Sequence, residues 1–330
     1  MLFNLNKILI ITGVAALALF LAFLFWWQWE GATIGYENKQ ESGGGRHLAS
    51  LTGLECENYS RRPVAVMMAS DPIARPLSGI GQADIVFEMP VTPNGITRMM
   101  AVFQCEEPQE IGSVRSARED FLTFVKSFDA LYAHWGGERE ALNKLDSGIL
   151  DNIDGMKYEG TVFYRKNSKP RPHNGFTTLS LITEKAKELG YILDDSFPGF
   201  IRENIKIDRN LSNLVSMVSV DYPSPYDVKW VYDNDSGRYR RSRGGEIESD
   251  INNNDQVQSD VIVVMHTTSK FLSRDYISIN TTGEGEAEFY QNGVRASGKW
   301  KNVADDLKFY DINGQEMTLV PGKIWIEIII

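Results

Sequence analysis

The longest apolar run of the chain lies near its N-terminus. Residues 8–27 contain no charged side chain, and a helix of that length spans about 30 Å, the thickness of a bilayer's hydrocarbon core. Tryptophans follow at positions 26, 27 and 29, where membrane–water interfaces favour them. The run is too long for the apolar region of a signal peptide, and no small-residue cleavage site follows it. We therefore expect residues 1–29 to form an uncleaved transmembrane helix.

A polar stretch separates this helix from the first folded domain. Residues 30–50 include three consecutive glycines, which predicts a flexible tether. Beyond it, short apolar runs alternate with helix-like segments. Strands are expected at 63–69, 83–89, 97–105, 129–135 and 161–165, and helices at 117–128, 138–145 and 180–189. Because strands interleave with helices, residues 51–202 are predicted to form a mixed α/β (α+β) layered domain.

The pattern changes after residue 202. No long helical segment follows, and short apolar runs are separated by turn residues. An Asn-Gly pair at 292–293 is a strong hairpin signal between two strands. The chain closes with the apolar run 323–330. Residues 203–330 are therefore predicted to form a small, mainly β domain.

Charge and cysteine usage add an orientation and a compartment. Lys7 precedes the apolar run, so the positive-inside rule places the N-terminus in the cytoplasm and the domains outside it. Cys56 and Cys105 are the only cysteines, and an oxidising compartment favours a disulfide between them. Two buried free thiols are the alternative. We favour the disulfide, because Cys56 lies just before one predicted strand and Cys105 ends another.

Net charge and missing motifs exclude several classes of function. The formal net charge is −10, which argues against nucleic acid as a partner. The chain contains no G-x-x-x-x-G-K-[ST] phosphate loop, no H-E-x-x-H pair and no G-x-S-x-G elbow. With the cysteines paired and histidines few, a zinc site lacks ligands. We expect no metal and no cofactor.

The segment 112–120, GSVRSARED, carries the most specific chemical signal. Ser116 and Glu119 have the spacing of a capping box, which predicts a helix beginning at this point. Arg115 and Arg118 would then lie beside the positive end of the helix, where cations are disfavoured unless an anion is present. An internal carboxylate could neutralise them instead, with Glu88 as the leading candidate. A surface carboxylate could do the same: Glu106, Glu107, Glu119 or Asp120. The segment therefore predicts either an anion site or an ion pair.

Other polar residues lie at strand ends and in a stiff loop. His134 ends an apolar strand, where functional groups of layered folds often lie. His173 and Asn174 follow a Pro-Arg-Pro sequence, and Arg98 begins a predicted strand. A structural, hydrogen-bonded role is the alternative for each histidine. We expect these residues to form a ligand pocket together with the two arginines of segment 112–120.

Long stretches of the chain resemble the bacterial YerB-like family, DUF3048. The resemblance is carried by RPVAVMMASDPIARPLSGIGQADIVFEM, EEPQEIGSVRSARED, DALYAHWGGE and RPHNGFT in the first half, and by VYDNDSGRYRR, AEFYQNGVRASGKW and FYDINGQEMTLVPGKIWIEI in the second. It implies an extracytoplasmic protein, as many members are lipoproteins, although this chain has no cysteine just after its apolar run. The family carries no settled activity.

Three hypotheses about function follow. The first is an envelope binding module whose pocket holds an anionic peptidoglycan fragment, a wall-polymer phosphate or an acidic protein segment. The second is an envelope hydrolase with Glu88 or Asp84 as base and His134 or His173 as acid–base group. The third is a scaffold that recruits wall enzymes. We favour the binding module, because no nucleophile or metal constellation is visible.

Overall fold

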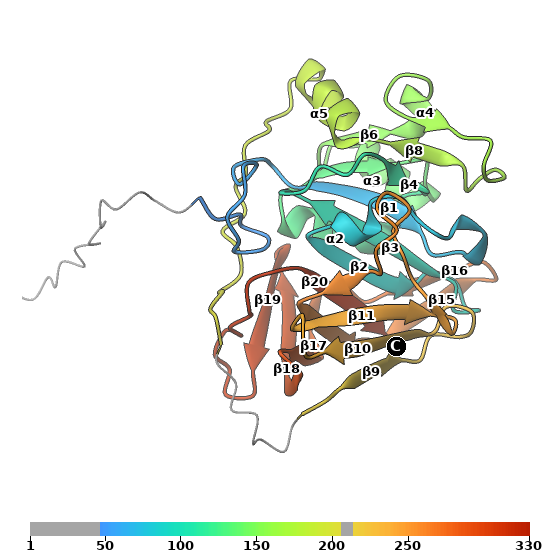
Figure 1. Ribbon diagram of the computed structural model, residues 1–330. Coiled ribbons are helices and arrows are strands. Elements are labelled where there is room, and N and C mark those ends of the chain that lie inside the picture. The colour runs from blue at the N-terminus through green and yellow to red at the C-terminus, as the bar shows by residue number, and fades with distance from the viewer. Residues whose placement is uncertain (1–46, 206–213) are drawn as a thin grey trace, which may run out of the picture. The chain divides into compact units, whose positions relative to one another are not determined.

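The computed structural model describes residues 47–205 and 214–330, which belong to one compact unit. These residues are mostly β-structure with a few short helices (Figure 1). The predicted transmembrane helix, residues 1–29, lies outside the described residues. In the part of the chain that is described, no helix is long and apolar enough to cross a membrane.

A ten-stranded sheet forms the centre of the fold. In spatial order its strands are β19 (Asp306–Asp311), β18 (Val294–Val303), β17 (Gly283–Gln291), β14 (Val261–His266), β20 (Ile324–Ile329), β2 (Ile85–Pro90), β3 (Thr97–Phe103), β1 (Val64–Ala69), β5 (Leu131–His134) and β6 (Asn152–Asp154). The last strand of the chain, β20, pairs in parallel with both β2 and β14. Its apolar run is buried because both of its edges and both of its faces are covered.

This arrangement corrects the predicted fold class. A mixed α/β first domain followed by a separate small β domain is wrong, because the described chain is mainly β and one sheet contains strands from both segments. The sequence pattern located the individual strands but did not indicate which strands pair. For example, β2 and β20 are neighbours in the sheet although they lie far apart in the chain. Whether 51–202 and 203–330 unfold as separate domains stays a prediction.

Short helices cover the two faces of the large sheet. α2 (Glu119–Ser127) packs on one face, where its Phe124 ring lies 4.5 Å from that of Phe87. α5 (Leu179–Glu188) buries Ile182 on the opposite face. α3 (Arg139–Asp146) follows β5, and α4 (Gly155–Tyr158) follows β6. The alternating residues of β1 therefore contribute to two cores, one on each side of the sheet.

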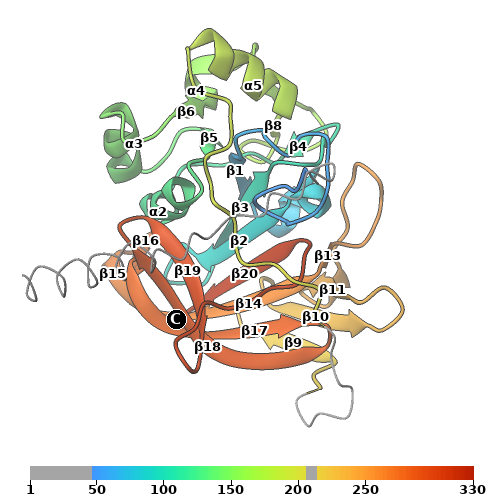
Figure 2. The ribbon, with the colours of Figure 1, turned by 90° about the vertical axis from the view of Figure 1, so that its left-hand side faces the viewer.

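Smaller sheets surround the large one. A second sheet has the order β12 (Glu246–Ile247), β11 (Arg238–Arg243), β10 (Val228–Asp233) and β9 (Met217–Val220), and β13 (Gln258–Ser259) pairs with β11. The remaining strands are β4 (Ile111–Gly112), β8 (Gly175–Thr177) and β7 (Tyr164–Arg165) in one sheet, and β15 (Ser269–Ser273) and β16 (Tyr276–Ile279) in a ribbon. Figure 2 shows β10 and β11 alongside β14 and β20.

A buried cluster of charges joins the second sheet to the large one. Arg241 and Arg243 point inward from β11 and are at most 2% exposed. They meet Glu88 of β2 and Glu327 of β20, both fully buried, and Glu248. Arg241 Nη2 lies 2.6 Å from Glu88 Oε2 and 3.0 Å from Glu327 Oε1, and Arg243 Nη1 lies 2.7 Å from Glu88 Oε1. We call these five residues the ionic cluster.

Charge balance explains how the ionic cluster is tolerated. Burial alone would raise the pKa of Glu248, but Arg241 and Arg243 lower it to about 2. Burial raises the pKa of Glu327, and the negative charge of Glu88 adds to this effect. Two guanidiniums therefore face three carboxyl groups, of which Glu327 is the one whose pKa burial and Glu88 raise. Such a group is strongly destabilised when one partner is removed, because an uncompensated charge stays buried.

Aromatic residues enclose the ionic cluster. The Arg241 guanidinium lies 4.1 Å from the centre of the Trp325 ring, a favourable cation–π contact. Trp230 Nε1 donates to Glu327 Oε1 at 3.0 Å. The Tyr222 hydroxyl lies 3.1 Å from the carbonyl oxygens of both Glu88 and Ile328. These contacts exclude water, which strengthens each charged interaction.

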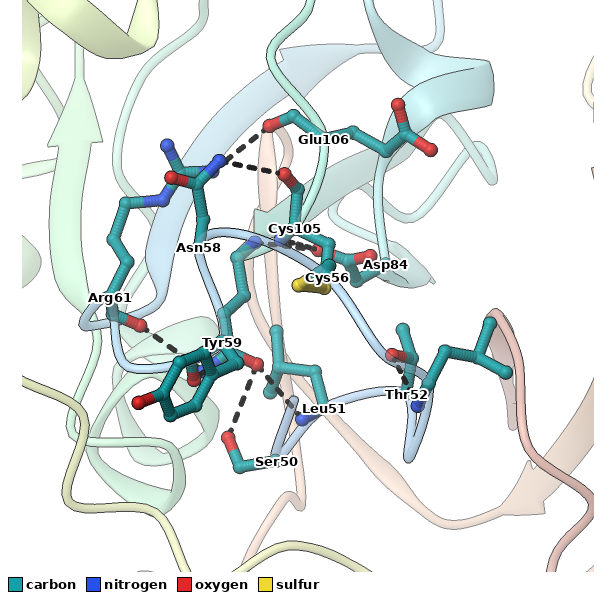
Figure 3. The surroundings of a disulfide bond; sticks show 12 residues. Ser50, Leu51, Thr52, Cys56, Asn58, Tyr59, Arg61, Asp84, Cys105 and Glu106 are labelled. Atoms are coloured by element: carbon teal, nitrogen blue, oxygen red, sulfur yellow. Dashed lines mark hydrogen bonds between the residues drawn. A yellow bond between two sulfur atoms is a disulfide. The ribbon is translucent and has the colours of Figure 1, made fainter. Parts of the chain in front are cut away.

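The predicted disulfide is confirmed. Cys56 and Cys105 are bonded, with their Cα atoms 5.7 Å apart (Figure 3). Asp84 accepts a hydrogen bond from the Cys105 amide at 2.9 Å, and Asn58 Nδ2 donates to the Cys105 carbonyl at 3.0 Å. The bridge therefore fastens the entering segment of the described chain to the end of β3. Asp84 therefore has a structural role, because its hydrogen bond to the Cys105 amide holds the same end of β3.

We expect Arg243→Met to lower the free energy of unfolding by about 3–5 kcal/mol, because Glu88 would keep a buried charge without its main partner. Chemical denaturation measures this change. The matched control is Arg139→Met at an exposed position of α3, which should change stability by less than about 0.5 kcal/mol. A loss below about 1 kcal/mol in Arg243→Met would show that the cluster does not hold the sheets together.

Replacing both cysteines with serine should lower the free energy of unfolding by about 4 kcal/mol on the chain-entropy model, given a sequence separation of 49 residues. Thermal and chemical denaturation should be compared with and without a reductant. The wild-type protein should lose stability on reduction, whereas the double variant should not respond. Equal stability of the wild type and the variant without reductant would contradict a stabilising bridge.

Candidate functional site

The backbone around Arg115 inserts between two strands of the large sheet. β1 and β5 pair in parallel up to Val66 and Ala133. Beyond this point residues 113–117 lie between them: the Arg115 amide donates to the Met67 carbonyl at 2.8 Å, and the Trp135 amide donates to the Arg115 carbonyl at 2.9 Å. Arg115 is therefore held at the carboxyl ends of two parallel strands, where binding sites of such sheets usually lie.

Arg98 lies near the same strand ends, and its side chain is buried although it is charged. It is the second residue of β3 and pairs with Ala69, the last residue of β1. Its side chain is 4% exposed, and its Nε and Nη1 atoms have no hydrogen-bond partner among the described residues. The nearest carboxylate oxygen, Asp71 Oδ2, is 3.8 Å from Nη1. Burial and the charge of Arg115 lower the pKa of Arg98 to about 9.

Asp71 and His173 complete the surroundings of Arg98. Asp71 lies two residues after the end of β1, and His173 lies in the loop between β7 and β8. Asp71 Oδ2 and His173 Nδ1 are 3.8 Å apart, and neither atom has a hydrogen-bond partner in the described part of the chain. The Tyr226 hydroxyl donates to Asp71 Oδ1 over 3.5 Å. Burial, reinforced by Arg115, lowers the pKa of His173, so its ring is neutral near pH 7.

Arg115 and Ser113 contribute further donors that are not used internally. Arg115 Nη1 reaches the Pro172 carbonyl only at 3.5 Å. Arg115 Nε and the Ser113 hydroxyl are buried and lack partners within residues 47–205 and 214–330. We call Asp71, Arg98, Arg115 and His173 the arginine cradle. Such a concentration of unsatisfied buried donors is costly in a structural core and is typical of a binding site.

Arg118, the other arginine of the pair, does not share this environment. Its Nη1 lies 3.1 Å from Glu138 Oε2, and its guanidinium stacks 4.7 Å from the centre of the Tyr276 ring. Glu138 also accepts from the Glu119 amide at 2.5 Å. The Glu138 carboxylate therefore neutralises the charge of Arg118 and also accepts a hydrogen bond from the first amide of α2.

The predicted capping box is wrong. α2 begins at Glu119, its N-cap residue is Arg118, and the cap has no side-chain hydrogen bond. The Ser116 hydroxyl instead donates to the Trp135 carbonyl at 3.3 Å, because the strand-like insertion continues through residue 117. Glu88 was also the wrong partner for the arginine pair. It lies in the ionic cluster, while Glu138 pairs with Arg118.

The other residues predicted for the pocket have framework roles. His134 is fully buried, with Nδ1 2.8 Å from the Gly136 carbonyl and Nε2 3.2 Å from Asn152 Oδ1. Asn174 Oδ1 accepts from Arg165 Nη1 at 2.9 Å, which orders the loop beside His173. Of the predicted pocket residues, Arg98, Arg115 and His173 therefore come together, while Arg118, His134 and Asn174 support the surrounding structure.

The carboxylates proposed for hydrolysis are occupied elsewhere. Glu88 belongs to the ionic cluster, and Asp84 accepts the amides of Gln104 and Cys105. Among the described residues no group of three or more His, Cys, Asp or Glu side chains is arranged to hold a metal ion. Sequence reasoning missed Asp71, Ser113 and Tyr226. The expectation that functional groups lie at strand ends, which singled out His134, could also have found Asp71. This residue lies two positions after the end of β1.

Both halves of the chain match one family. Residues 51–192 match the N-terminal domain, and residues 218–326 the C-terminal domain, of "Protein of unknown function (DUF3048)". The chain is 32% identical over 295 residues to "Putative lipoprotein YerB" of Bacillus subtilis (strain 168), covering 85% of this chain and 86% of that protein. The crystal structure of YerB from Bacillus subtilis is similar, with a TM-score of 0.78 over 86% of this chain and 96% of that one, at 32% identity.

Arg98→Met should leave the free energy of unfolding unchanged or raise it by about 1 kcal/mol, because an apolar side chain of similar length removes a poorly compensated buried charge. Chemical denaturation without added ligand measures the change. Arg243→Met is the comparison, since that arginine is fully bonded and its loss should destabilise. A loss above about 2 kcal/mol in Arg98→Met would show that Arg98 holds the fold.

Proposed function

Because this chain belongs to the DUF3048 family of proteins of unknown function, we propose its function from the site itself: it is an extracytoplasmic binding protein that holds an anionic ligand of the cell envelope in the arginine cradle. The ligand is a fragment of peptidoglycan, a wall polymer or an acidic segment of a partner protein. The observation that carries the proposal is the buried Arg98 guanidinium, whose Nε and Nη1 atoms find no partner among the described residues.

Two observations support the location. The Bacillus subtilis relative is named as a lipoprotein, a class attached to the outer surface of a membrane. The bond between Cys56 and Cys105 fits an oxidising compartment. The orientation expected from Lys7, with the N-terminus in the cytoplasm, stays a prediction because residues 1–46 lie outside the described part of the chain.

The charges around the cradle support an anion as ligand. Arg98 and Arg115 converge on one internal carboxylate, Asp71, which does not come within hydrogen-bond distance of Arg98. An oxyanion placed between the guanidiniums would accept charge-assisted hydrogen bonds, the strongest kind available to it. It would also restore the pKa of Arg98 toward its ordinary value. Since both guanidiniums are at least partly desolvated, each such bond is worth more than it would be at an exposed site.

We expect Arg98→Gln and Arg115→Gln each to weaken binding of the envelope ligand at least about tenfold, because each removes a charge-assisted hydrogen bond of about 1.5–3 kcal/mol. Isothermal titration of the purified chain in detergent, against muropeptide and wall-polymer fractions, measures the dissociation constant.

Arg139→Gln is the matched control, because this arginine is 84% exposed in α3. It should bind as the wild type does. Unaltered binding by Arg98→Gln and Arg115→Gln would place the ligand elsewhere on the protein and overturn the proposal.

A further inference from the structure

The arginine cradle contains an acceptor as well as donors, and this restricts the ligand. Asp71 Oδ2 is buried, has no hydrogen-bond partner in the described part of the chain, and lies 3.8 Å from both Arg98 Nη1 and His173 Nδ1. A buried carboxylate oxygen without a donor is destabilising. A ligand that fills the cradle must therefore present a hydrogen-bond donor next to the oxyanion that meets the arginines.

The charge of the cradle restricts the ligand further. Arg98 and Arg115 carry two positive charges, Asp71 carries one negative charge, and the His173 ring is neutral near pH 7. Lys169 lies nearby, and its ammonium donates to the carbonyl oxygens of Ala74 and Pro76, which are uncharged and leave its positive charge in place. The surroundings of the cradle are therefore positive overall. An oxyanion is the ligand group that this charge favours.

We propose that the ligand is the free carboxyl terminus of a peptide, with its carboxylate between Arg98 and Arg115 and the amide N–H of its last peptide bond donating to Asp71. This inference rests on the proposed function and names the ligand class of the same site. A peptide terminus carries one negative charge and an N–H beside it, as the cradle requires.

Exposure gives the direction of approach. Asp71 and His173 are 18% and 13% exposed, whereas Arg98 is 4% exposed. The carboxylate therefore lies on the Arg98 side of the cradle, and the preceding residues of the peptide extend toward solvent on the side of the more exposed Asp71 and His173. Tyr226, in the second half of the chain, donates a hydrogen bond to Asp71. This contact holds the Asp71 carboxylate in place to accept from the amide N–H of the peptide.

A phosphodiester of a wall polymer is the competing ligand, and its chemistry fits less well. It also carries one negative charge and could meet the two arginines. It offers no hydrogen-bond donor, so Asp71 Oδ2 would stay buried and unsatisfied. The peptide terminus satisfies both the arginines and Asp71.

The test uses four small probes in isothermal titration with the full chain in detergent. N-acetyl-D-alanyl-D-alanine has the carboxylate and the amide. Its C-terminal amide lacks the charge. N-acetyl-D-alanyl-D-lactate keeps the carboxylate but has an ester oxygen in place of the N–H. Dimethyl phosphate represents the phosphodiester. We expect the first to bind most tightly, and the C-terminal amide and the ester each to bind at least about tenfold more weakly.

Asp71→Ala isolates the contact that distinguishes these ligands. Without the Asp71 carboxylate, the amide and ester probes should bind equally, since the preference depends on one pair of groups. An L,L-dipeptide probe separates the two sources of a peptide terminus. Tighter binding of the D,D-peptide indicates a wall stem peptide, and tighter binding of the L,L-peptide indicates a protein terminus; either result supports the proposal.

The outcomes separate this inference from the proposed function. Equal binding of the ester and the amide by the wild type, or tighter binding of dimethyl phosphate, overturns the peptide terminus while an anion site sensitive to Arg98→Gln remains. Binding that Arg98→Gln does not weaken, or an absence of binding by every anionic probe and envelope fraction, overturns both.

Discussion

The ionic cluster is the constraint on which the rest of the molecule depends. Glu88 and Glu327 lie on adjacent strands of the large sheet, and Arg241 reaches both from the second sheet. Each of these side chains is fully buried, so a shift of one sheet relative to the other would leave a charge without its partner. Geometry this restrictive specifies one arrangement of the sheets, even where apolar residues of the same volume could supply equal stability.

Fixing the second sheet also builds the candidate site. The turn between β9 and β10 carries Tyr226 to Asp71, and Arg75 Nη2 donates to the Pro225 carbonyl at 2.9 Å. The same Arg75 donates to the Ser70 carbonyl at the end of β1. The segment that follows β1 is therefore held between the two sheets. The residues of the arginine cradle all lie in the first half of the chain, and a turn of the second half contacts the cradle through Tyr226 and Asp71.

Arg243 and Arg98 show how two buried arginines can differ in role. Arg243 Nη1 lies 2.7 Å from Glu88 Oε1, and its partners raise its pKa despite burial. Arg98 has an ion pair only at 3.8 Å, and burial lowers its pKa. A protein retains such a poorly compensated charge when a ligand compensates it. Burial alone does not identify a functional arginine, and Arg98 differs from Arg243 in that two of its buried nitrogens have no hydrogen-bond partner among the described residues.

The sequence by itself determined the local elements and the chemistry that they carry. Apolar runs marked β1, β2, β3 and β20, the cysteine pair implied the disulfide, and the arginine-rich segment pointed to an anion site. A local signal also failed, because Ser116 and Glu119 have capping-box spacing while the backbone around them is drawn between β1 and β5 by tertiary hydrogen bonds. The alternation of β11 does not reveal its inward face, because arginines lie on both faces: Arg238 and Arg240 on one, Arg241 and Arg243 on the other.

Only the tertiary structure decided which charges meet. Glu88 and Arg243 are 155 residues apart, as are Asp71 and Tyr226. No periodicity or spacing pairs such residues, because a side chain's electrostatic partner depends on the path of the whole chain. Arg98, Arg115 and Arg118 look alike in the sequence, yet Glu138 neutralises only Arg118. The sequence named the arginines, and only the tertiary structure left Nε and Nη1 of Arg98 and Nε of Arg115 without a hydrogen-bond partner among the described residues.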